Sequence, residues 1–134
     1  MTAHVSSRVR QQVRRRAEGK CEYCLVHEED GYVGYQIDHI MVRKHGGATS
    51  LDNLAFACLL CNRYKGSDVA APDPTTGEIV PLFNPRQQRW QEHFTLQGAL
   101  IVARSSIGRA TANLLRLNSP ERVIERVEFV KAGH

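Results

Sequence analysis

The sequence predicts an α+β fold, with short strands in the middle of the chain and helices towards both ends. Apolar residues recur at helical spacing near the start and again near the end of the chain. Between these parts, residues 32–41 carry Tyr, Val and Ile between glycines, a composition typical of a strand or a hairpin. Two Cys-x-x-Cys turns bracket this central part.

The bulk composition is that of an ordinary soluble domain. The chain has 134 residues, so we expect 1–134 to form a single domain. A net charge of +4 and a sequence pI of about 9.1 suit a polyanionic partner such as nucleic acid, although so small a charge is weak support. No secretory signal is visible, and no stretch approaches the roughly 18 apolar residues of a membrane span. We therefore expect a cytoplasmic protein with reduced thiols.

Residues 6–18 are predicted to form a basic N-terminal helix. One face carries apolar residues at four-residue steps: Val5, Val9, Val13 and Ala17. Arginines occupy the other faces, and Gly19 is placed to end the helix. The arginines, Arg14 and Arg15 among them, have two interpretations of equal weight. They form either a solvated charged face or a surface that lies along a phosphate backbone.

The remaining elements follow from local composition. Residues 32–41 are expected to form a strand or a hairpin that turns at Gly34, and residues 43–51 a loop. Residues 62–68 are expected to open a short helix, and residues 78–82 to form a short strand. A C-terminal helical extension is expected over residues 85–131. Its predicted helices are 85–94, with Pro85 at the start and Trp90 as a core anchor, 107–117 and 121–130.

The four cysteines predict a structural zinc site. They form two Cys-x-x-Cys turns, Cys21 with Cys24 and Cys58 with Cys61. Each turn directs two thiolates at one ion, and two turns complete a tetrahedron that leaves no position for water. Disulfides would be unusual in a reducing compartment, and a redox-active pair would not explain the second copy. The turns are separated by 33 residues, more than the roughly 15–20 of a compact zinc ribbon.

The inserted segment carries further motifs, and with them a resemblance. In order come Asp38-His39-Ile40, Gly46-Gly47, Asp52-Asn53-Leu54, and then Asn62 directly after the second cysteine pair. With the two Cys-x-x-Cys turns and the basic residues that follow, this pattern resembles the HNH family of nucleases. It covers about 21–66, the expected HNH core. The flank at 77–85 is more loosely similar to small bacterial HNH proteins.

The resemblance implies a ββα-metal fold and a set of site residues. His39 would be the general base, a role that suits an imidazole titrating near ~6.5. Asp38 and Asn62 would hold one divalent ion through oxygen, which favours Mg²⁺ or Mn²⁺. Asn53 would position the loop that presents His39 without touching the ion. Asn62 stands where many members of the family carry His, and Asn is a known variant there.

Neighbouring residues on a regular strand face opposite sides. Asp38 and His39 can therefore share a site only if the strand ends, twists or bulges at that point, and we predict such an irregularity.

Three further residues are candidates for contact with nucleic acid. Arg63 and Lys65 follow Asn62 on the predicted helix and either grip phosphates or form a solvated face. His45 adjoins two glycines on a loop that could approach phosphate, although a lone His more often packs within a loop.

The leading hypothesis is a metal-dependent endonuclease acting on DNA, with RNA also considered as substrate. Two alternatives remain: a non-catalytic zinc module that binds nucleic acid or protein, and a redox protein with reactive thiols. No separate recognition domain is evident, so we expect weakly specific cleavage, or targeting by a partner protein. A single metal site cuts one strand at a time, so double-strand breaks need two events or a homodimer.

Overall fold

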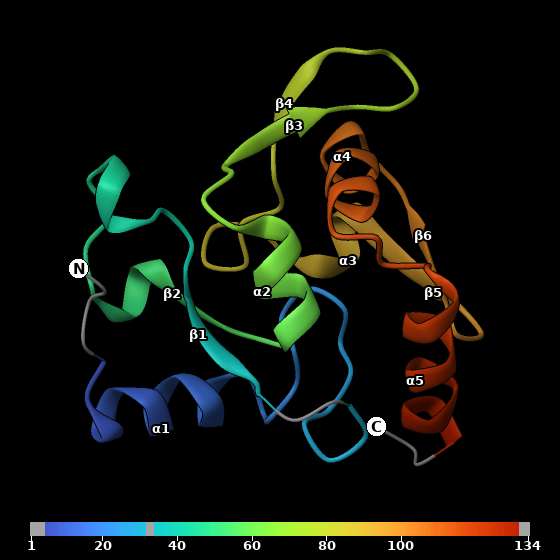
Figure 1. Cartoon of the computed structure of the whole chain (residues 1–134). Coiled ribbons are helices and arrows are strands. Elements are labelled where there is room, and N and C mark those ends of the chain that lie inside the picture. Colours follow the sequence, from blue (N-terminus) through green and yellow to red (C-terminus); the bar gives the residue numbers. More distant parts are fainter. Residues whose placement is uncertain (1–4, 32–33, 132–134) are drawn as a thin grey trace.

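The structure is a computed structural model that describes residues 5–31 and 34–131. The fold is α+β, as the sequence predicts, with helices at both ends and short antiparallel strand pairs between them (Figure 1). Within the described residues the strands form three separate two-stranded sheets, β1–β2, β3–β4 and β5–β6. No helix in the described part of the chain is long and apolar enough to cross a membrane.

Helix α1 (Ser7–Arg16) confirms the predicted basic helix, slightly shortened at its C-terminal end. Ser6 caps its start, where the Ser6 hydroxyl accepts a hydrogen bond from the backbone N–H of Val9 at 3.2 Å. Val13 is fully buried, and the helix packs against β2 below the β1–β2 hairpin (Figure 1). The Arg16 guanidinium donates hydrogen bonds to the carbonyls of Leu51 (2.8 Å) and Leu54 (2.6 Å), which joins α1 to the beginning of β2.

A β-hairpin followed by a helix forms the centre of the molecule. Strand β1 (Gln36–His39) pairs antiparallel with β2 (Leu54–Ala57), and helix α2 (Leu59–Lys65) follows and packs on β1. Every residue of β2 is buried, so this strand lies inside the main core. The connection between the strands carries two short 3₁₀ helices, η1 (Arg43–His45) and η2 (Leu51–Asn53). The strand predicted at 32–41 is thus observed over 36–39, and residues 32–33 lie outside the described part.

The β3–β4 hairpin lies at one end of the molecule, against helix α4 (Figure 1). It comprises β3 (Ala70–Pro72) and β4 (Ile79–Pro81), so the strand predicted at 78–82 is confirmed. The buried Asp73 carboxylate accepts two hydrogen bonds from the Arg109 guanidinium on α4, at 3.0 and 2.7 Å. This forked pair fixes the hairpin to the helix.

The prediction of a helix over 85–94 is wrong. The helical extension expected over 85–131 is therefore wrong in its first part. Only α3 (Trp90–His93) is helical there, and it leads directly into a hairpin of β5 (Phe94–Gln97) and β6 (Leu100–Ala103). A two-residue Gly98-Ala99 turn joins these strands, with Gly98 at a φ of 61°, which glycine adopts at little cost. This glycine between alternating apolar residues was the available sequence signal for a hairpin.

Two helices close the chain, as predicted. Helix α4 (Ser106–Leu114) corresponds to the prediction at 107–117, and Ser105 caps it by accepting a hydrogen bond from the Gly108 N–H at 3.0 Å. Helix α5 (Pro120–Lys131) corresponds to the prediction at 121–130 and begins with proline at a position where its missing N–H costs nothing. Its buried side chains include two arginines, Arg122 and Arg126.

Candidate functional site

The four cysteines come together in one buried cluster. Their sulfur atoms all lie within 4.8 Å of one another, and the Sγ atoms of Cys24 and Cys58 are 3.8 Å apart. The first pair lies in the turn that follows α1, and the second lies at the start of α2. In each turn the backbone N–H of the second cysteine is directed at the sulfur of the first, at 3.5 Å for Cys24 and 3.3 Å for Cys61.

The geometry and charge of this cluster fit a zinc ion. Zn–S bonds of about 2.3 Å in a tetrahedron place the sulfurs roughly 3.8 Å apart, the separation found between Cys24 and Cys58. All four thiols are free and buried. Burial raises the pKa of Cys21 and Cys61, whereas hydrogen bonds from the neighbouring thiols lower the pKa of Cys24, so ionising all four thiols together requires a positive charge among the sulfurs. The four cysteines thus form a potential structural zinc site, with each position of the ion filled by thiolate.

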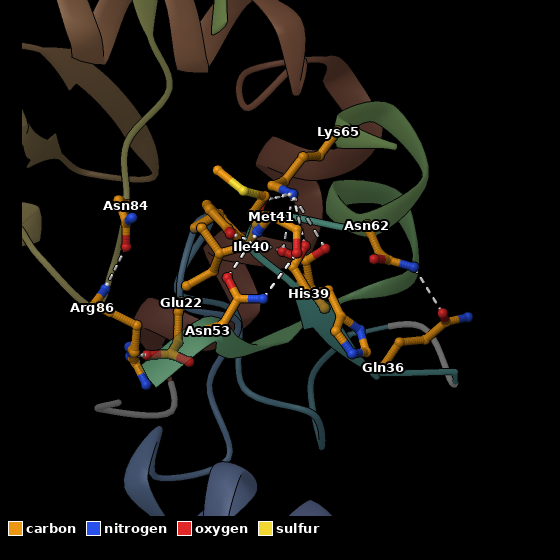
Figure 2. A network of polar contacts seen from close by, with 12 residues as sticks. Glu22, Gln36, His39, Ile40, Met41, Asn53, Asn62, Lys65, Asn84 and Arg86 are labelled. Atoms are coloured by element: carbon orange, nitrogen blue, oxygen red, sulfur yellow. Dashed lines mark hydrogen bonds and ion pairs between the residues drawn. The ribbon is translucent and has the colours of Figure 1, made fainter. Parts of the chain in front are cut away.

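Asn53 organises the loop between β1 and β2 (Figure 2). Its side-chain oxygen accepts a hydrogen bond from the Met41 N–H at 3.0 Å. Its side-chain nitrogen donates to the carbonyls of Met41 and Ala48, both at 2.8 Å. Gly47 lies so close that an added Cβ would be 1.7 Å from the Met41 carbonyl oxygen. Asn53 and Gly47 therefore fix the fold of the chain on either side of η1, directly after His39.

His39 is the last residue of β1, and its ring is half-buried. The Nε2 atom lies 2.9 Å from the hydroxyl oxygen of Thr49. Burial lowers the pKa of His39 and outweighs the nearby Asp38 carboxylate, which acts in the opposite direction. Imidazole is therefore the dominant form at neutral pH. No sequence motif indicated Thr49, a loop residue that the fold places next to the His39 ring.

Asp38 lies almost entirely inside the protein, at 4% exposure. Its carboxylate accepts a hydrogen bond from the Tyr23 hydroxyl at 2.9 Å and forms an ion pair with the Lys65 ammonium at 3.4 Å. Burial raises the pKa of Asp38, while the Lys65 charge and the Tyr23 hydrogen bond act against that shift. Neither Tyr23 nor Lys65 was predicted to touch Asp38.

Asp38 and His39 belong to a regular antiparallel ladder, paired with Ala55 and Leu54. The register has no bulge here, and the strand ends at His39. Figure 2 shows the His39 ring pointing away from the Lys65 ammonium, which contacts the Asp38 carboxylate. The two predicted site residues thus lie side by side in sequence, with their side chains directed to different surroundings.

Asn62 lies on α2, one turn before Lys65. Its amide nitrogen donates a hydrogen bond to the Gln36 side chain at 2.7 Å, and Figure 2 shows its amide oxygen directed away from Gln36. The oxygen atoms of Asp38 and Asn62 are of the type that Mg²⁺ and Mn²⁺ prefer. A carboxylate has about four acceptor positions, so the two contacts to Asp38 leave capacity. The oxygen atoms of these two residues therefore suit a hard divalent ion. Such an ion would bind the same Asp38 carboxylate as the Lys65 ammonium.

The residues expected to contact nucleic acid divide into two groups. Arg15, His45 and Arg63 are exposed. Arg14 is also exposed but forms an ion pair with Glu28 at 2.6 Å. Lys65 is 2% exposed, and its ammonium donates hydrogen bonds to the carbonyls of His39 and Ile40 at 3.2 and 3.0 Å. In this position Lys65 is directed at the end of β1 and not at solvent.

The hairpin, the helix and the cysteine cluster together define a ββα domain with a site for a structural metal. Residues 21–68 match the family model of the HNH endonuclease. The match includes all four cysteines and ends just after α2. No curated protein and no solved structure matches the chain.

Proposed function

We propose that this protein is a metal-dependent HNH endonuclease that hydrolyses phosphodiester bonds in DNA. The observation that carries the proposal is the placement of His39 within the matched HNH segment. Its imidazole is half-buried at the end of β1, and its Nε2 atom lies 2.9 Å from the Thr49 hydroxyl. A zinc module that only binds nucleic acid would need no such arrangement.

In this proposal His39 activates the attacking water. A neutral imidazole has one nitrogen that donates and one that accepts. When Nε2 donates to the Thr49 hydroxyl, Nδ1 carries the lone pair and can take a proton from water. The lowered pKa of His39 keeps the ring in this unprotonated form at neutral pH. Asn53 supports the reaction indirectly, because it holds Met41, two residues after His39, and Ala48, the residue directly before Thr49.

Asp38 and Asn62 are the proposed ligands of the divalent ion, Mg²⁺ or Mn²⁺. When bound, such an ion neutralises charge on the phosphate and on the leaving oxygen. Tyr23 and Lys65 hold the Asp38 carboxylate in place. Exposed Arg15, Arg63 and His45 are the proposed phosphate contacts, and these contacts position the substrate without selecting a sequence. Double-strand breaks would need two such cuts or a second copy of the chain.

A nicking assay on supercoiled plasmid tests the proposal. Zinc-loaded protein should convert it to the nicked form only when Mg²⁺ or Mn²⁺ is present, and the zinc-loaded His39→Ala variant should not. Single-stranded DNA and RNA should be tested in parallel, because they also carry the phosphates that Arg15, Arg63 and His45 are proposed to contact. If all three substrates remain intact with folded, zinc-loaded protein, the non-catalytic binding module becomes the better account.

A further inference from the structure

Arg122 connects the C-terminal helix to the cysteine cluster. Its guanidinium Nη2 lies 2.9 Å from the sulfur of Cys61 and 3.4 Å from that of Cys58. The other terminal nitrogen donates to the Leu115 carbonyl at 3.1 Å. The side chain is 1% exposed and belongs to α5, outside the segment that matches the HNH family model. No motif in the sequence connected this residue with the cysteines.

The charge of the cluster explains why a cation is needed there. Four thiolates around one Zn²⁺ carry a net charge of −2, and the cysteines are buried, where uncompensated charge is costly. A guanidinium stays protonated at any ordinary pH, and its donors can reach two acceptors at once. Arg122 therefore reduces the net charge to −1 and donates charge-assisted hydrogen bonds to the sulfurs.

We propose that Arg122 is the outer-sphere counter-charge of the zinc centre, and that its contact with the sulfurs strengthens zinc binding by the four cysteines. The contacted sulfurs belong to Cys58 and Cys61, in the first turn of α2 and just before Asn62. The C-terminal helix is thus held to the helix that carries a proposed catalytic ligand. The inference rests on the cysteine cluster alone and stands whether or not the protein cleaves DNA.

Arg126 provides a matched control on the same helix. It lies one turn beyond Arg122 and is also fully buried. Its guanidinium donates to the carbonyls of Ala99 and Leu117 and to the Asn118 side chain, and none of its hydrogen bonds to the described residues goes to sulfur. Substituting either arginine removes a buried cation that interacts electrostatically with the cysteines, but of the two only Arg122 donates hydrogen bonds to the sulfurs.

The test measures the zinc affinity of the full-length wild type, Arg122→Met and Arg126→Met by competition with a chromophoric chelator. Loss of a group that supports metal ligands typically weakens binding about 10- to 100-fold. We expect a loss of this size for Arg122→Met and a clearly smaller loss for Arg126→Met, which removes a nearby charge but no hydrogen bond to sulfur. Both variants should unfold at lower temperature. Equal zinc affinities in the two variants would overturn the proposal.

A second measurement tests the contact of Arg122 with the thiolates if Arg122→Met does not fold. Arg122→Lys keeps the positive charge but loses the forked donors. In Co²⁺-substituted protein, the thiolate-to-cobalt charge-transfer bands report hydrogen bonds to the sulfurs. These bands should move to lower energy in Arg122→Lys and stay in place in Arg126→Lys. Identical bands in wild type and Arg122→Lys would show that Arg122 does not act on the thiolates.

Discussion

The Tyr23 hydroxyl donates a hydrogen bond to the Asp38 carboxylate at 2.9 Å. Tyr23 lies inside the first Cys-x-x-Cys turn, between Cys21 and Cys24, whereas Asp38 is one of the proposed ligands of the catalytic ion. One side chain thus connects the potential zinc site to the candidate active site. Because Asp38 is buried, this hydrogen bond and the Lys65 ion pair determine where its carboxylate lies.

Removing the Tyr23 hydroxyl should destabilise the protein more than removing a comparable hydroxyl elsewhere. A hydrogen bond to a charged group contributes about 1.5–3 kcal/mol, against about 0.5–1.5 kcal/mol for a neutral pair. Tyr35 is the control, because it is also buried and its hydroxyl donates to the neutral Val26 carbonyl at 2.8 Å. Urea unfolding of zinc-loaded Tyr23→Phe and Tyr35→Phe should show the larger loss for Tyr23→Phe. Equal losses would show that the hydrogen bond from Tyr23 to Asp38 contributes no more to stability than the hydrogen bond from Tyr35 to Val26.

Thr49 should act as a positioning residue for His39. Thr49→Val keeps the size of the side chain and removes the hydroxyl that lies 2.9 Å from Nε2. A misplaced reacting group can cost up to about 100-fold in rate, so we expect kcat for plasmid nicking to fall roughly 10- to 100-fold with little change in KM. Thr49→Ser should restore most of the rate. A Ser variant as slow as the Val variant would argue against a role for the hydroxyl.

The pH dependence of nicking should reflect the lowered pKa of His39. The general base must be unprotonated, so kcat/KM should rise with pH and level off. The midpoint of this rise should lie below 6.5, the ordinary value for histidine. The exposed Arg43 contributes to this lowering through its charge, so Arg43→Gln should move the midpoint upwards. A wild-type midpoint above 6.5 would contradict the burial of the ring as the controlling effect.

Gly47 should tolerate no side chain, whereas its neighbour Gly46 should tolerate one at moderate cost. A Cβ at Gly47 would be 1.7 Å from the Met41 carbonyl oxygen and 2.9 Å from the Asn53 side-chain nitrogen. A Cβ at Gly46 would meet nothing within 4 Å, and only its φ of 91° opposes substitution. Gly46→Ala should lose about 1–2 kcal/mol from backbone strain. Gly47→Ala should lose more and should also slow nicking, because it displaces the loop that presents His39. Similar stability and activity in the two variants would contradict this account.

Local patterns predicted the parts of the fold that depend on local chemistry. Cysteine spacing indicated the metal cluster, and apolar periodicity indicated α1, α4 and α5. Pro85 and Trp90 suit a helix, but only residues Trp90–His93 of the predicted 85–94 are helical. The β5–β6 hairpin that follows was not predicted, because its local signal is the single turn at Gly98-Ala99.

Contacts between distant residues could not be predicted in the same way. Thr49 reaches His39, and Arg122 reaches Cys61 across 61 positions of the chain, only because tertiary packing brings them together. Lys65 was expected either to grip phosphate or to lie on a solvated face of the helix, and its burial contradicts both expectations. Its position three residues after Asn62 on α2 instead turns the ammonium towards β1, where it meets Asp38.

The proposed role of His39 as the base in DNA cleavage can be tested in one variant that separates binding from cleavage. Zinc-loaded His39→Ala and wild type should be compared for equilibrium binding to DNA and for Mg²⁺-dependent nicking of plasmid. We expect the nicking rate to fall by at least about 100-fold, the usual contribution of a general base, while the Kd for DNA stays close to wild type. Unchanged nicking by a folded His39→Ala protein would contradict this role.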